Sequence, residues 1–296
     1  MILVTGGTGF VGQHLIRQLS RFGYDIRLLL RPSTHSPALP LGVPVEAAVC
    51  SLRDERGLMA AMQGVDVVFH LASADRAGSR GDLNGVDVEG TASFVRVCQQ
   101  AGINRLFYIS HIGADRNSAF PLFRAKGLAE MHIQQSGVPY TILRSSVLFG
   151  RGDHFSEPFT QLMRKLPFIF LLPGDGQNLL QPLWVEDLIS SLMLSMDEPA
   201  TINQLMTVGG METMSLGEAM GAFMDASGVH RTLVPLPLTT MHTLSMWIDQ
   251  SYPRFPISIH WIDYVSSDRI CPLDSLPRLF GLMPARMKPL LSYLRT

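Results

Sequence analysis

Short unbroken apolar runs alternate with segments of helical apolar spacing along the first half of the chain. The runs predict strands that are buried on both faces, and the spaced segments predict amphipathic helices. The predicted strands cover residues 1–5, 24–30, 43–49, 66–72, 105–110 and 140–149, and the predicted helices cover 11–22, 54–62, 84–101 and 121–136. Strands that alternate with helices in this way indicate an α/β fold with a doubly wound parallel sheet.

The rhythm changes after Gly150, where a stretch rich in glycine and proline begins. Further elements are predicted as helices at 157–166, 186–196 and 215–227, a strand at 204–208, and a mostly helical tail. Ser215 and Glu218 have the spacing of a capping box at the start of the third of these helices. We expect a core of residues 1–150, with 183–228 packing back onto it, and a small C-terminal cap of residues 151–182 and 229–296.

A glycine-rich turn, TGGTGFVG, joins the first predicted strand to the first predicted helix and contains Gly6, Gly9 and Gly12. The first glycine permits a tight turn, the second lets backbone amides approach a pyrophosphate, and the third permits close helix packing. The helix N-terminus adds partial positive charge. A purely structural turn could have the same glycines, but the strand before and the helix after favour a dinucleotide in an NAD(P)-binding Rossmann fold.

The end of the second predicted strand indicates which dinucleotide is bound. A carboxylate there would hold the ribose 2′-hydroxyl of NAD, but the position holds Arg31. Asp25 lies at the beginning of that strand, away from the edge where ligands bind. A guanidinium suits a 2′-phosphate, so we expect NADP(H) rather than NAD(H), although Arg31 could also be an ordinary surface charge.

Composition excludes several other classes of protein. The net charge is −1, whereas nucleic-acid binders carry a basic excess. The glycine turn follows the first residues so closely that no signal peptide fits, and no apolar run reaches the length of a membrane span, which predicts a cytoplasmic protein.

Only 17% of the residues are charged, against about 25% in an average protein. The surplus of apolar residues is greatest in Phe168–Leu172 and in the methionine-rich and proline-rich later chain. We expect core packing there, with an apolar substrate pocket or a docking surface for a protein or the membrane periphery as the alternative.

Several segments in order along the chain carry a family resemblance: TGGTGFVG, VDVVFHLAS, DVEGT, YISHIGAD, FRAKGLAE and PYTILRSSVLFG. Together they resemble the atypical and extended short-chain dehydrogenase/reductase superfamily, which includes epimerase/dehydratase-like and NmrA-like proteins. The arrangement is most similar to the NADPH-binding accessory subunits of respiratory complex I. The resemblance implies that the pyrophosphate lies along Thr8, Gly9, Phe10 and Val11 and that Ser51 and Leu52 flank the adenine. It also implies that the nicotinamide half of the cofactor lies over Leu71, Ala72 and Ser73. Lys126 is then expected to hold the nicotinamide ribose. An aspartate is usual at the position of Ser51, so the adenine contact is changed.

One departure from the family concerns catalysis. The family pairs a tyrosine with a lysine four residues later, because the ammonium favours the phenolate, but Leu122 stands four residues before Lys126. We expect the strand residues Tyr108 and Tyr140 not to reach Lys126. Ser110 and His111 occupy the place of the family's hydroxyl partner, so His111 or Lys126 itself could supply the proton; otherwise each has a structural or cofactor-contacting role.

Other polar residues have simpler expected roles. We expect His70 to be a satisfied core residue, Asp153 and His154 to form a polar turn more readily than a substrate contact, and Asp187 to support the fold. The spacing of histidine, cysteine and carboxylate residues predicts no metal site.

Two functions remain open on this reading. The first is an NADP(H)-dependent oxidoreductase acting on a small apolar carbonyl, enone or quinone, with Lys126 and His111 replacing the tyrosine. The second is a protein that binds NADPH without turnover and serves as a structural, assembly or redox-sensing component. Leu122 argues against a third class, the nucleotide-sugar epimerases and dehydratases.

Overall fold

The computed structural model describes residues 1–33, 39, 42–252 and 259–295 of the 296-residue chain. The contacts divide the chain into two compact units. Unit 1 contains Met1–Ala74, Asp82–Arg144 and Ile189–Met206, and unit 2 contains Asp75–Gly81, Ser145–Leu188 and Thr207–Thr296. Each unit therefore combines segments that are far apart in the sequence.

The predicted doubly wound sheet is present and has seven strands in the order β11-β6-β5-β4-β1-β2-β3. The strands are β1 (Ile2–Thr5), β2 (Ile26–Leu30), β3 (Glu46–Val49), β4 (Val67–His70), β5 (Arg105–His111), β6 (Tyr140–Ser145) and β11 (Gln204–Val208). Pairing from β3 through β2, β1 and β4 to β5 is parallel. Thr5 aligns with Leu29 on one side and with His70 on the other, so neighbouring strands end level.

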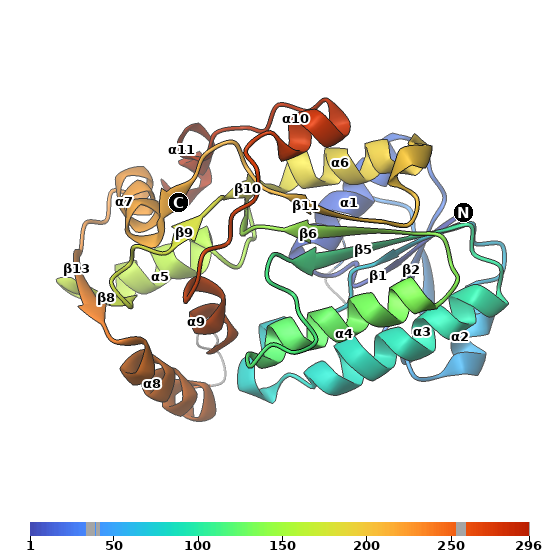
Figure 1. Ribbon diagram of the computed structural model, residues 1–296, viewed down its shortest axis with the longest axis horizontal. Coiled ribbons are helices and arrows are strands. Elements are labelled where there is room, and N and C mark those ends of the chain that lie inside the picture. Colours follow the sequence, from blue (N-terminus) through green and yellow to red (C-terminus); the bar gives the residue numbers. More distant parts are fainter. Residues whose placement is uncertain (34–38, 40–41, 253–258, 296) are drawn as a thin grey trace. The chain divides into compact units, whose positions relative to one another are not determined.

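Helices cover both faces of this sheet (Figure 1). On one face lie α2 (Glu55–Ala61), α3 (Glu89–Gln100) and α4 (Pro121–Gln135), and on the other lie α1 (Phe10–Arg21) and α6 (Val185–Asp197). The first face buries a continuous apolar cluster that includes Val68, Phe94, Leu106 and Ile133. Burial on both faces explains why the strands read as almost uninterrupted aliphatic runs.

Three details differ from the predicted elements of unit 1. The helix expected at 84–101 begins with one wide turn, η2 (Asn84–Val88), before α3. The strand expected at 140–149 is two strands, β6 and β7 (Leu148–Phe149), because the chain leaves the large sheet at Ser145 and β7 pairs with β10 (Leu183–Trp184). The short helix η3 (Pro199–Thr201) follows α6.

Unit 2 contains short strand pairs and several helices. β8 (Ile169–Pro173) pairs in parallel with β13 (Thr232–Leu236), and β9 (Leu179–Leu180) pairs with β12 (Met214–Ser215). The helices are η1 (Asp75–Arg80), α5 (Ser156–Lys165), α7 (Leu216–Ser227), α8 (Leu238–Ser251), α9 (Ile259–Val265), α10 (Ser275–Phe280), α11 (Met287–Leu290) and η4 (Leu291–Arg295). The capping box of Ser215 and Glu218 is formed at the start of α7. β13 was not predicted, because its prolines suppressed the strand pattern.

The two units follow a different division from the expected one. Residues 183–228 were expected with the core, but only Ile189–Met206 of that segment belongs to unit 1. Helix α7 instead packs against α5 and η4 within unit 2. Residues Asp75–Gly81 also belong to unit 2, where the Gly78 carbonyl lies 3.1 Å from His260 Nε2 of α9.

Candidate nucleotide-binding site

The residues predicted to contact the dinucleotide gather at one edge of the sheet in unit 1. Gly6 follows β1, Arg31 follows β2, Ser51 lies just beyond β3, Leu71 follows β4, and Ser110 lies near the end of β5. These are the carboxyl ends of five neighbouring parallel strands. In open α/β sheets ligands bind at this edge, where the strand order reverses, and here the reversal lies between β1 and β4.

The glycine turn forms a narrow cradle between β1 and α1. Gly6 has φ +68°, and a Cβ atom there would lie 2.5 Å from the carbonyl carbon and oxygen of Leu71. A Cβ at Gly12 would lie 2.4 Å from the Gly6 oxygen. Helix α1 begins at Phe10 with Gly9 as its N-cap, and its first turn carries no acidic residue. The turn therefore needs glycine for steric reasons, and its shape fits a pyrophosphate bound by backbone amides.

A buried hydrogen-bond chain fixes the neighbouring turn after β4. Thr5 Oγ1 accepts hydrogen bonds from the backbone amides of Leu71 and Ala72, both at 3.2 Å. Its own proton is directed to His70 Nδ1 at 2.8 Å, and His70 Nε2 in turn donates to Thr91 Oγ1 at 2.9 Å. Complete burial lowers the pKa of His70 to about 3, so the ring stays neutral. His70 is thus the satisfied core residue that we expected.

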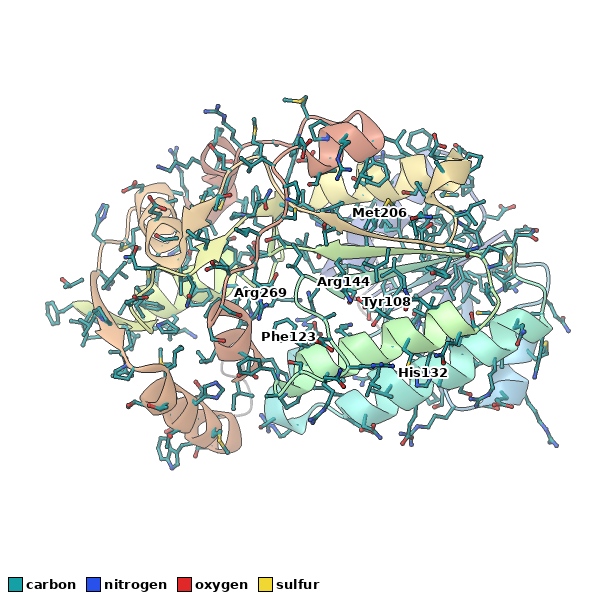
Figure 2. All side chains as sticks on the ribbon, viewed as in Figure 1. Tyr108, Phe123, His132, Arg144, Met206 and Arg269 are labelled. Carbon is teal, nitrogen blue, oxygen red and sulfur yellow. The ribbon has the colours of Figure 1, made fainter. Side chains whose placement is uncertain are left out.

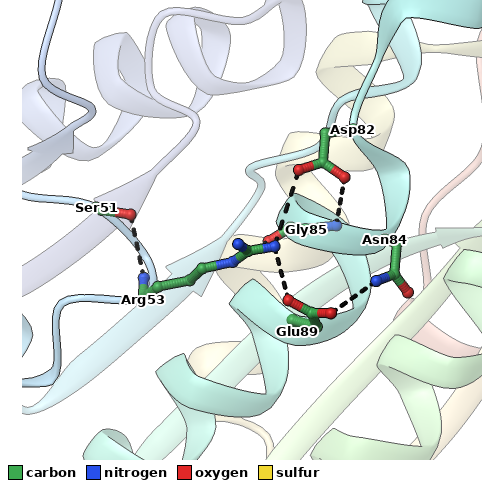
Figure 3. A network of polar contacts seen from close by, with 6 residues as sticks. All are labelled: Ser51, Arg53, Asp82, Asn84, Gly85 and Glu89. Atoms are coloured by element: carbon green, nitrogen blue, oxygen red, sulfur yellow. Dashed lines mark hydrogen bonds and ion pairs between the residues drawn. The ribbon is translucent and has the colours of Figure 1, made fainter.

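The loop after β3, which we expect to lie beside the adenine, carries Arg53 at the centre of a network of polar contacts (Figure 3). Arg53 Nη2 lies 2.7 Å from Glu89 and 3.8 Å from Asp82, and Arg53 Nε donates to the Gly85 carbonyl. Ser51 Oγ accepts the backbone amide of Arg53 at 3.2 Å. Ser51 therefore helps to hold the loop after β3 against η2. Arg31 is exposed at the end of β2, and Asp25 precedes that strand, at the far edge of the sheet.

Lys126 lies on the buried face of α4, where it has two partners that sequence reasoning missed. Its ammonium is 3.0 Å from Asp87 Oδ1, and the other Asp87 oxygen accepts the amide of Ala74 at 2.9 Å. Both members of this ion pair are at least 96% buried. Lys126 Nζ also lies 5.4 Å from the centre of the Tyr108 ring. The expectation that Tyr108 cannot reach Lys126 was wrong, because α4 packs over β5 on the face that Tyr108 occupies (Figure 2).

Tyr108 is buried at the point where it meets Lys126. Its side chain is 1% exposed, and burial raises the pKa of its hydroxyl to about 12. The position one turn before Lys126 is occupied by Leu122, which is buried against Leu83 and Ala125. Unit 1 thus has an acid too deeply buried to reach a substrate, and an apolar side chain where the family places the acid.

Ser110 and His111 lie at the end of β5, but alternation along the strand places them on opposite faces. Ser110 shares the face of Tyr108 and Lys126 and is fully buried, whereas His111 is partly exposed on the other face. Strand alternation therefore places His111 on the face of β5 opposite to that of Tyr108, which α4 covers.

Arg144, Asp153 and Asp187 have hydrogen-bond partners within the fold. Arg144 Nε donates to Glu130 at 2.9 Å. Asp153 accepts the amides of Gly150, Phe155 and Glu157 and the hydroxyl of Ser156 at the start of α5, which makes it the centre of a polar turn. Asp187 accepts the amide of Ala285 at 2.8 Å within unit 2. Burial lowers the pKa of His154 to about 4.

Comparison with known proteins agrees with this site. The profile of a family described as NAD(P)H-binding matches residues 6–154. The chain is 24% identical over 291 residues to a 3beta-hydroxysteroid-dehydrogenase/decarboxylase isoform 2 of Arabidopsis thaliana, covering 84% of this chain and 52% of that protein. It is 27% identical over 245 residues to the mitochondrial NADH dehydrogenase [ubiquinone] 1 alpha subcomplex subunit 9 of the same plant, covering 79% and 60%. The chain thus spans only about half to three fifths of these relatives' lengths.

Solved structures support the fold. A UDP-glucose 4-epimerase from Thermotoga maritima superposes with a TM-score of 0.72 at 20% identity, and the match covers 99% of this chain and 98% of the epimerase. Within the described residues, no helix combines the length and apolar character required to cross a bilayer. The glycine cradle, the edge of the sheet beside it and the matching profile together lead to one conclusion: the chain belongs to the NAD(P)H-binding family of the short-chain dehydrogenase/reductase superfamily.

Proposed function

We propose that this protein binds NADP(H) at the sheet edge and holds it without catalysing hydride transfer, as a structural or redox-sensing component. The observation that carries the proposal is Leu122, which occupies the family's acid position and is packed against Leu83 and Ala125. A carbonyl that receives a hydride also needs a proton, and leucine has none to give. Lys126 would hold the nicotinamide ribose, with Asp87 and Ala74 fixing its position.

The relatives are compatible both with this role and with the alternative, an NADP(H)-dependent oxidoreductase. One relative is named as a dehydrogenase/decarboxylase, and the other is named as a subunit of a larger assembly. The position of His111 on the opposite face from Lys126 favours the second kind of role. Thr8, Phe10, Val11 and Ser73 would add contacts along the cofactor, as the family resemblance implies.

The test is a fluorescence titration of the full chain with NADPH, followed by an assay of NADPH consumption with simple ketones, 3-ketosteroids, quinones and enones. We expect saturable binding and consumption no faster than in buffer, because Leu122 occupies the position of the family's acid. Consumption above the buffer rate with any of these compounds would contradict the proposal, and the variant His111→Phe would then show whether His111 is the acid. Failure to bind either NADPH or NADH would also contradict it.

Arg31 provides the test of NADP(H) preference. Its guanidinium is exposed just beyond β2, where the adenosine 2′-phosphate would lie. We expect Arg31→Asp to weaken NADPH binding at least about tenfold, because a charge-assisted bond is replaced by repulsion, and to change NADH binding much less. Arg21→Asp, at the exposed end of α1, is the matched control and should leave both affinities unchanged. Equal losses for the two dinucleotides in Arg31→Asp would refute the assignment.

A further inference from the structure

An exposed apolar segment follows α5 in unit 2. It consists of Leu166, Pro167, Phe168 and Ile169, here called the apolar hook. Phe168 is 83% exposed and Ile169 is 49% exposed. With Leu171 these residues line a wholly apolar hollow of about 460 Å³. Isolated exposed apolar residues are ordinary, but four consecutive exposed apolar residues that together line a hollow are typical of a docking surface.

The backbone holds the Phe168 ring outward at a cost. Phe168 has φ +63°, in the left-handed region that aromatic residues rarely adopt. The amide of Ile169 donates to the Pro167 carbonyl at 2.7 Å, which closes a three-residue turn around Phe168. Arg231 Nε donates to the Leu166 carbonyl at 2.6 Å, and the amide of Thr232 donates to the Phe168 carbonyl at 2.9 Å. The hook is thus fixed by β13, although its ring gains little packing within the protein.

Strand β8 continues this surface. Phe170 and Leu172 point into unit 2, where the Phe170 ring lies 6.0 Å from that of Phe159. The alternate residues Ile169 and Leu171 lie on the outer face, beside their register partners Thr232 and Val234 of β13. The expectation of core packing for Phe168–Leu172 therefore holds for Phe170 and Leu172, whereas Phe168, Ile169 and Leu171 face outward.

Charge around the hook differs from that of the whole chain. The full chain has 24 basic and 25 acidic residues, and is therefore balanced. Segments 161–173 and 226–237, which contain the hook, β8 and β13, hold the basic residues Arg164, Lys165 and Arg231 and no Asp or Glu. The acidic residues nearest in sequence are Glu157, Asp175 and Asp225, all beyond these segments.

We propose that the apolar hook inserts into the surface of an anionic lipid bilayer, with the surrounding cations at the headgroups. An aromatic and aliphatic tip within a basic rim is the pattern that binds such surfaces, since apolar insertion and attraction to anionic lipids add together. A second copy of this chain is disfavoured, because symmetric pairing through the hook would bring two sets of cations together. The inference is independent of the nucleotide site, because all of its residues lie in unit 2.

The experiment is sedimentation of the full chain with vesicles of phosphatidylcholine alone or mixed with phosphatidylglycerol. We expect binding to the anionic vesicles, weaker binding to the neutral ones, and a decrease as salt is raised. No binding to anionic vesicles, or equal binding to both kinds, would overturn the proposal. A concentration-dependent dimer in sedimentation velocity that Phe168→Asn disrupts would overturn it in favour of self-association.

Variants test the hook itself. Phe168→Asn should weaken vesicle binding at least about tenfold, because a large apolar group is lost. Asparagine tolerates positive φ, so the thermal midpoint should stay the same or rise. Phe22→Asn is the matched control, since Phe22 is 64% exposed but lies at the end of α1 in unit 1, and it should bind as the unchanged protein does. Lys165→Glu should weaken binding about tenfold, while Arg21→Glu should not. Unchanged binding by Phe168→Asn would refute the proposal.

Discussion

Replacing Gly6 with alanine is expected to abolish measurable NADPH binding. The new Cβ would lie 2.5 Å from the carbonyl group of Leu71 and 2.7 Å from the amide nitrogen of Ala72. Both contacts are with backbone, so no side chain can turn away, and the glycine turn must separate from the turn after β4. The left-handed φ of +68° adds about 1–2 kcal/mol. Because the dinucleotide would lie along both turns, we expect affinity to fall at least about 100-fold, or about 2.7 kcal/mol.

Gly23→Ala separates the steric effect from the conformational one. Gly23 has φ +76°, but a Cβ there would meet no atom within 4 Å. This control should lose stability through its φ alone and keep its NADPH affinity. The measurements are fluorescence titration and the thermal midpoint of both variants. If Gly6→Ala bound NADPH within about threefold of the unchanged protein, the cradle would not be the binding site.

The sheet and its ligand edge could be predicted because they depend on local patterns. Apolar runs and spaced apolar positions located nearly every element of unit 1, and the glycine turn lay between a strand and a helix as expected. Level strand ends follow from parallel pairing, so residues that end successive strands meet at one edge. Gly6, Arg31 and Leu71 could therefore be assigned to one site without knowledge of any contact.

The partners of Lys126 could not be predicted in the same way. Asp87 lies 39 positions earlier in the chain, within DVEGT, and it reaches Lys126 only because η2 packs against α4. The only signal in the sequence was that both residues lie in segments that resemble the family, Asp87 in DVEGT and Lys126 in FRAKGLAE. Tyr108 reaches Lys126 because of the side of β5 on which α4 packs, which strand periodicity alone does not give.

A sequence pattern could not predict which residues of Phe168–Leu172 are exposed. Phe168–Leu172 reads as a uniform apolar run, so it gives no alternation from which an outer face could be inferred. The outer face exists because β13, whose prolines disguise it, pairs with β8 at the edge of unit 2. Local composition predicted where the surplus lies, and tertiary pairing determined which side chains remain exposed.

Replacing Asp87 with asparagine is expected to destabilise the protein by about 3–5 kcal/mol, because it leaves the buried Lys126 ammonium without its counter-charge. Asparagine keeps the shape of the side chain, and its carbonyl can still accept the amide of Ala74; its NH2 group then faces the Lys126 ammonium, so both the counter-charge and the acceptor are lost. The measurement is urea unfolding at neutral pH. Glu130→Gln, on the helix that carries Lys126, is the matched control. Its partner Arg144 retains a 26% exposed side chain, so water can solvate the unpaired guanidinium and the loss should be smaller.

The double variant Asp87→Asn with Lys126→Met decides the cause. If the loss comes from an uncompensated charge, removing that charge restores most of the stability, because methionine fills a similar volume with an apolar chain. A double variant as unstable as Asp87→Asn would mean instead that packing around η2 causes the loss. Recovery in the double variant, together with a small loss in Glu130→Gln, would identify Asp87 as the group that fixes Lys126 in a chain where leucine replaces the family's tyrosine.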